Sequence, residues 1–163
     1  MLLEERLHEA FAELGWIRIP DILHQHAEEA SKNNITYLDF LDKLLAEELA
    51  AKHERFIKMK TRMAHLPYRK TLEDFDFSFQ PSIDERRIRD LATLRFVEHQ
   101  ENLVLLGPPG VGKTHLAVAL ALEAIARRYT VYFTTAHELV QNLQQASLNH
   151  TIQQKMKTYI KPN

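Results

Sequence analysis

The chain has 163 residues, with 21 Lys and Arg, 22 Asp and Glu and a formal net charge of −1, which is enough sequence for one domain or for a small domain joined to part of another. It has no cysteine, which excludes a disulfide framework and a cysteine-ligated zinc site. It has no apolar run of about 18 residues and its first residues are acidic, unlike a signal peptide, so we expect a cytoplasmic protein with no membrane association.

Charged residues are distributed unevenly along the chain. Residues 1–51 contain four Lys and Arg against eleven Asp and Glu, whereas residues 52–70 contain seven basic residues against one acidic residue. Such asymmetry is typical of a surface that binds nucleic acid, and a solvated helix face is the alternative.

Apolar spacing predicts three helices in the first part of the chain, over residues 2–14, 20–32 and 37–65. Gly15 is placed to end the first helix, and Thr36, with Asp39 three residues later, is placed to begin the third. We expect these helices to form an N-terminal bundle over residues 1–66. The third helix carries these apolar residues: Leu38, Leu41, Leu44, Leu45, Leu49, Phe56 and Met63.

Residues 67–82 are predicted to be a connector. Aromatic and polar residues alternate in it as far as Phe79, which indicates a strand or a segment pressed on the next domain. A helix is predicted over residues 83–100, and residues 83–163 are predicted to be the N-terminal part of a second, incomplete domain. In this domain the expected strands are 102–106 and 130–135, and the expected helices follow residue 114 and span 136–146 and 148–160.

A glycine loop lies between the first of these strands and its helix. Its sequence matches G-x-x-x-x-G-K-[ST], the phosphate-binding P-loop or Walker A motif. Gly110 and Gly112 allow backbone N–H groups to surround a phosphate, Lys113 adds a positive charge, and Thr114 offers a hydroxyl to Mg²⁺. We therefore expect ATP and Mg²⁺ as ligands, with Thr114 contacting the metal through the nucleotide complex. The predicted nucleotide-binding residues are Gly107, Pro108, Pro109, Gly110, Val111, Gly112, Lys113, Thr114 and His115, although a packing role is also open for His115.

The acidic group that P-loop enzymes use for catalysis has no counterpart in this sequence. After Thr114 the only acidic residues are Glu123 and Glu138, and neither follows an apolar strand. A Walker B carboxylate is therefore missing, no catalytic residue is assigned, and we expect ATP binding with little or no hydrolysis.

Several segments together resemble the IstB-like helper ATPases of insertion-sequence transposition, which are AAA+ proteins similar to helicase loaders of the DnaC type. The resemblance rests on residues 37–41, 72–77 and 88–91 and on the loop with its extension, 107–117. It implies an α/β fold class: an N-terminal α-helical bundle followed by the first part of a P-loop (AAA+) three-layer α/β domain, truncated before Walker B. It also implies binding to duplex DNA, a transposase of the same element as partner, and homo-oligomers in the intact family. Aromatic residues near the loop, Phe75 and Phe77, become candidates to flank the adenine, or they pack the connector on the core.

The basic stretch is the candidate DNA contact. Its helical members recur three, three and four residues apart, which places them on one face of the third helix. The residues predicted to contact DNA are Lys52, Arg55, Lys58, Arg62, Arg69 and Lys70. Two alternatives stay open: a helicase loader of DNA replication, and a non-hydrolysing DNA-binding fragment.

Overall fold

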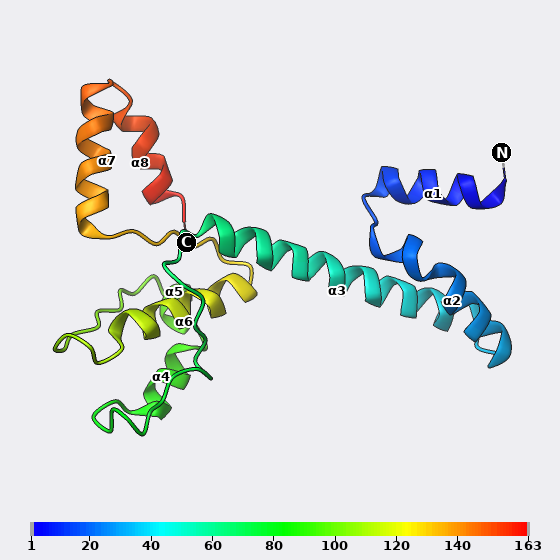
Figure 1. Cartoon of the computed structure of the whole chain (residues 1–163), viewed down its shortest axis with the longest axis horizontal. Helices are drawn as coiled ribbons and strands as arrows, with labels where there is room; N and C mark the ends of the chain where they lie inside the picture. Colours follow the sequence, from blue (N-terminus) through cyan, green and yellow to red (C-terminus); the bar gives the residue numbers. More distant parts are fainter. Residues whose placement is uncertain (1, 163) are drawn as a thin grey trace. The chain divides into compact units, whose positions relative to one another are not determined.

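The computed structural model describes residues 2–162, and within them the only regular secondary structure is helical (Figure 1). The chain divides into two compact units, one ending at Phe56 and the other beginning at Ile57, and α3 contributes to both. None of the helices in this range is long and apolar enough to cross a membrane. The helices are α1 (Leu3–Leu14), α2 (Arg18–Lys32), α3 (Tyr37–Met63), α4 (Glu85–Leu91), α5 (Arg95–Glu98), α6 (Lys113–Ala126), α7 (Ala136–Leu148) and α8 (Ile152–Ile160).

The first unit is built around a small apolar core between α2 and α3. Ile19, Ile22 and Leu44 are buried there, and partly buried aromatic rings pack against them. Gly15 adopts the left-handed conformation that favours glycine, with φ 67°, and its N–H donates to the Ala12 carbonyl at 3.1 Å. The predicted end of the first helix is therefore confirmed.

Helix α3 begins where the sequence predicts. The Asp39 N–H donates to the Thr36 hydroxyl oxygen at 3.2 Å, and that hydroxyl donates to the Asp39 carboxylate at 2.6 Å. This side-chain capping satisfies a backbone donor that the first turn of a helix leaves without a partner.

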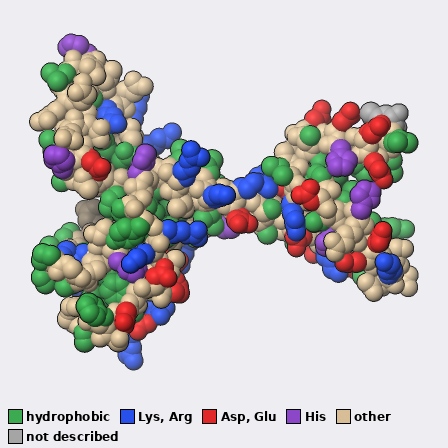
Figure 2. Space-filling model, in the orientation of Figure 1, with side chains coloured by type: hydrophobic (Ala, Val, Ile, Leu, Met, Phe, Trp, Pro, Cys, Tyr) green, Lys and Arg blue, Asp and Glu red, His purple; other side chains and the backbone are tan. Residues whose placement is uncertain are grey.

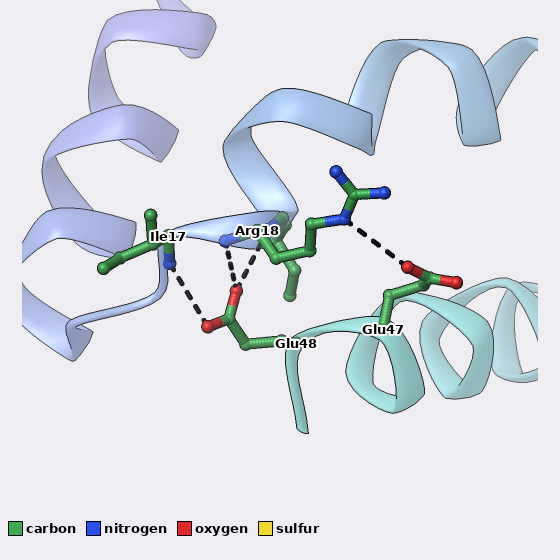
Figure 3. Close-up of polar contacts among 5 residues, drawn as sticks. Ile17, Arg18, Glu47 and Glu48 are labelled. Carbon is green, nitrogen blue, oxygen red and sulfur yellow. Dashed lines mark hydrogen bonds and ion pairs between the residues drawn. The ribbon is translucent and has the colours of Figure 1, made fainter. Parts of the chain in front are cut away.

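The start of α2 is capped by a side chain from another helix, because Ile17 at its N-cap position makes no side-chain cap bond. Glu48 of α3 accepts the N–H groups of Ile17, Arg18 and Ile19 at 3.2, 2.7 and 3.0 Å (Figure 3). Glu48 is only 2% exposed, and Arg55 donates to the same carboxylate at 2.9 Å. A buried carboxylate thus joins α2 to α3, with its charge balanced by a helix N-terminus and a guanidinium.

The second unit has its core around α6. Leu116 and Ala119 of this helix pack with Leu72 and Ile88, so the connector and α4 both lie against α6. Buried side chains lie on several sides of α6, as expected for a helix inside a core. The buried residues of α6 are Leu116, Val118, Ala119, Leu120, Ala124 and Ile125.

Helices α7 and α8 lie side by side as a helical hairpin (Figure 1). The hydroxyl of Thr135 accepts the N–H of Glu138 at 3.1 Å, and the Glu138 carboxylate accepts the N–H of Thr135 at 3.0 Å. This reciprocal capping box fixes the start of α7.

The predicted α/β fold class is wrong for this structure. The segments 102–106 and 130–135, expected as parallel strands of a three-layer domain, form no strand, and no sheet exists among residues 2–162. Leu105 packs on the core of the second unit, but Val104 and Leu106 are 71% and 89% exposed. A strand requires a neighbour for its backbone groups, and a stable sheet usually requires about three strands or more. The two segments do not supply that neighbour to each other; the Phe133 N–H donates instead to the Ala64 carbonyl at 2.8 Å.

The helix predicted over residues 83–100 is also divided. Helix α4 ends at Leu91, and α5 begins at Arg95 after a turn in which Leu94 has a φ of 65°. Leu94 is 1% exposed, and we attribute its unusual backbone to the burial of this side chain.

Candidate nucleotide site and basic surface

The glycine loop enters α6 through two residues with left-handed backbone conformations. Gly110 and Gly112 have φ of 82° and 90°, where any other L residue would be strained. A Cβ built on Gly110 would meet no atom within 4 Å, so this side of the loop is open. The loop leads into α6, whose N-cap Gly112 makes no side-chain cap bond and whose N-terminus is the positive end of the helix dipole. This combination of glycine loop and helix start suits an anion.

The lysine of the motif lies inside the loop. Its Nζ donates to the carbonyls of Gly107 at 2.8 Å and Pro108 at 2.6 Å. Two carbonyl oxygens of the loop therefore hold the ammonium group, and phosphate oxygens would be alternative acceptors for it. Thr114, the next residue, is exposed in the first turn of α6.

The connector lies against the beginning of α6. His115 Nε2 is 2.9 Å from the Thr71 carbonyl oxygen, and the ring of Phe75 meets the ring of His115 with a centroid distance of 5.1 Å. Asp74 closes a turn by accepting the N–H of Thr71 at 2.8 Å and its hydroxyl at 3.0 Å, and these bonds lower the pKa of Asp74. The alternating segment is thus pressed on the next part of the chain, as one of the two sequence interpretations proposed, and it is not a strand.

A cavity of about 390 Å³ lies between α4 and the loop. Its volume falls within the range of roughly 300–1,000 Å³ found for small-molecule sites. Lys113 lines it together with apolar residues from both sides, including Ile83 and Leu105. The cavity therefore places an apolar surface next to the charged lysine.

The predicted basic face falls largely on the exposed surface of α3. Lys52, Lys58 and Arg62 are exposed, and Figure 2 shows Lys and Arg side chains gathered over the C-terminal half of this helix. Arg69 and Lys70 follow the helix and are also exposed, with the Lys70 Nζ 5.9 Å from the centre of the Tyr68 ring.

Arg55 differs from the other members of this face, because its guanidinium binds Glu48. Glu48 was not among the residues predicted from the sequence. The available signal was its position on α3, four residues after the buried Leu44 and seven residues before Arg55, where a carboxylate would face the core. For the other basic residues, contact with DNA stays a prediction.

Comparison with known proteins decides the family. The family model described as IstB-like ATP binding protein matches residues 11–163. The chain belongs to this family. It is 46% identical over 160 residues to the protein of insertion sequence IS5376 from Geobacillus stearothermophilus, covering 98% of this chain and 64% of that protein. It is 43% identical over 129 residues to the protein of IS21 from Pseudomonas aeruginosa, covering 79% of this chain and 49% of that protein.

The names of both relatives describe them as ATP-binding proteins of an insertion sequence. A third relative so described, from IS232 of Bacillus thuringiensis subsp. berliner, is 40% identical over 129 residues, covering 79% of this chain and 52% of that protein. This IstB-like chain thus spans between about half and two thirds of the length of these relatives. The resemblance seen in the sequence is confirmed at the level of the family.

Proposed function

We propose that this IstB-like protein binds ATP with Mg²⁺ at the 107–114 loop and holds duplex DNA on the basic face of α3, as the helper of a transposase in the cytoplasm. The observation that carries the nucleotide site is the loop itself: two left-handed glycines lead into a largely buried helix whose first residue, Lys113, donates its ammonium to two carbonyls of the loop. The ATP-binding names of the relatives support the choice of ligand.

Each group of the loop has a separate task in this proposal. The backbone N–H groups around Gly110 and Gly112 surround the phosphates, and the N-terminus of α6 adds its dipole. Lys113 exchanges the Gly107 and Pro108 carbonyls for phosphate oxygens. Thr114 offers its hydroxyl oxygen to Mg²⁺, which neutralises phosphate charge when it is bound.

The ATP site is tested by replacing Lys113. We expect Lys113→Ala to weaken ATP binding by about 10-fold to 100-fold, because a charge-assisted hydrogen bond contributes about 1.5–3 kcal/mol. Isothermal titration calorimetry with ATP and MgCl₂ measures the affinity. Lys32→Ala is the matched control, since this lysine is exposed on α2 and pairs only with Glu28 among the residues described. Equal ATP affinity in Lys113→Ala and wild type would show that the loop is not the site.

The DNA surface is proposed from charge and exposure. Lys58 and Arg62 lie four residues apart on α3 and are exposed, so they are placed to contact phosphates, and Lys52 is exposed on the same helix. Phosphate contacts carry no base code, so we expect binding with little sequence preference and a steep dependence on salt.

The DNA surface is tested with the charge reversal Lys58→Glu/Arg62→Glu, which leaves the Glu48–Arg55 pair intact. We expect weaker binding to every duplex and a salt slope reduced by about 2, near one unit for each phosphate that the protein no longer neutralises. Fluorescence anisotropy with labelled duplexes at several NaCl concentrations measures both quantities. Lys32→Glu/Lys43→Glu makes the same change of charge elsewhere on the first three helices; if it lowered affinity equally, net charge rather than the α3 face would explain binding.

The partner is proposed to be the transposase of the same insertion sequence, and the helper is proposed to self-associate on DNA. The names of the relatives favour transposition over the loading of a replicative helicase, because each connects the protein with an insertion sequence. Co-purification of this chain with the transposase, but not with a replicative helicase, is the expected result.

A further inference from the structure

The ring of Phe75 lies directly against Gly112, the last residue before α6. A Cβ on Gly112 would stand 2.5 Å from Cε2 and 3.0 Å from Cζ of this ring, and the first distance is too short for any real Cβ unless the ring shifts. Gly112 is therefore glycine for two reasons: its φ of 90°, and the ring that occupies the place of a side chain.

The connector holds that ring in place from several sides. Phe77 meets Phe75 with a centroid distance of 4.8 Å, and His115 meets it at 5.1 Å from the first turn of α6. Leu72 is buried in one core cluster with Leu116 and Ala119, which anchors the start of the same segment to α6. The contact with Gly112 is thus part of a packed unit, and Phe75 cannot move without disturbing its neighbours.

We propose that Phe75 is a positioning residue for the phosphate loop, which couples the fold of the 71–79 segment to nucleotide binding. This inference rests on the proposed ATP site. The edge of the Phe75 ring limits where Gly112 can lie, and Gly112 sets the direction of the N–H groups that begin α6. A displacement of about 1 Å in such a group is enough to weaken its action strongly.

The coupling acts in both directions. If the packed connector favours the binding form of the loop, bound nucleotide must stabilise the packed connector by the same factor. The 71–79 segment follows α3 after only seven residues, Ala64–Lys70, so a change in its order begins close in sequence to the basic face.

Two substitutions at Phe75 test the proposal without removing the apolar side chain from the core. Phe75→Leu withdraws the ring edge from Gly112, and Phe75→Tyr adds a hydroxyl at Cζ, which already faces Gly112. Phe40→Tyr is the matched control, because Phe40 is another partly buried ring, packed on the core of the first unit.

Hydrogen exchange of the 107–115 amides without nucleotide is the first measurement. We expect faster exchange in both Phe75 variants and no change in the control, and an unchanged rate in both variants would overturn the positioning role whether or not ATP binds. Calorimetric ATP affinity is the second measurement. We expect ATP to bind at least about 10-fold more weakly to both variants, because a group misplaced by about 1 Å can lose about 100-fold of its effect.

Exchange of the 71–79 amides with ATP is the third measurement. ATP should slow exchange there in the wild type and much less in Phe75→Leu. If the wild type binds ATP and both Phe75 variants bind it equally well, this inference fails while the ATP site stands. If Lys113→Ala binds ATP like the wild type, the site itself is wrong and the inference falls with it.

Discussion

Removing the buried carboxylate of Glu48 should destabilise the first unit more than any surface change near it. Glu48→Ala leaves three N–H groups at the start of α2 without their acceptor, and Ile19 is among the most buried residues of the chain. It also leaves Arg55 without a partner, but this side chain is 40% exposed and can be hydrated.

The magnitude follows from which donors water can reach. The N–H of Ile19 is buried, whereas the bonds of Ile17 and Arg18 are only partly buried. One buried unsatisfied donor and the loss of a helix cap together cost about 2–4 kcal/mol. Leaving a fully buried charge without its partner costs about 3–5 kcal/mol. This figure is an upper limit here, because Arg55 reaches solvent.

Trp16 provides a local probe for this measurement. It is the only tryptophan of the chain and stacks on Phe11 at a centroid distance of 5.9 Å, one residue before the capped backbone. Urea unfolding followed by Trp16 fluorescence therefore reports on the first unit, which is necessary because a chain with two units need not unfold in one step.

Glu47→Ala is the matched control, since it removes the neighbouring carboxylate. Glu47 pairs with Arg18 at 3.5 Å with both side chains about half exposed, and such a surface pair contributes only about 0–1 kcal/mol. Equal urea midpoints for the two variants would refute the argument that Glu48 acts as the cap of α2.

Two further predictions concern acid and capping. Burial raises the pKa of Glu48, but the hydrogen bonds from Arg55 and from three backbone N–H groups outweigh it and hold this pKa below the ordinary value of 4.5. The stability that Glu48 contributes is therefore present above pH 4.5 and is lost as pH falls through the lowered pKa. In this acid window the free energy of unfolding, followed by Trp16 fluorescence, should fall in the wild type but not in Glu48→Ala. Thr135→Ala should destabilise α7 by about 0.5–2 kcal/mol, because it removes the capping box. Thr151→Ala should have less effect, because Thr151 makes no side-chain cap bond to α8. Helical circular dichroism during thermal unfolding measures the stability of both variants, and a larger loss in Thr151→Ala would contradict the capping assignment.

Local chemistry made several elements predictable from the sequence. The glycine that ends α1 and the Thr36 cap of α3 both depend on residues close together in sequence. Burial on α3 was less predictable. Of the five leucines whose spacing predicted this helix, Leu44 is buried, whereas Leu38 and Leu49 are 78% and 64% exposed. Periodicity marks an apolar face, but only the neighbouring helices determine which part of it is covered.

The sequence by itself determined the family and the glycine loop, because a phosphate-binding loop is written in a few adjacent residues whose backbone needs are local. Only the tertiary structure decided that residues 102–106 and 130–135 are not strands, since a strand depends on partners from elsewhere in the chain. It alone showed that Glu48 caps α2 from α3 across about thirty residues of sequence and binds Arg55, which the charge pattern had assigned to DNA. It also alone placed Phe75 on Gly112, 37 positions away, because side chains distant in sequence meet only when the core packs.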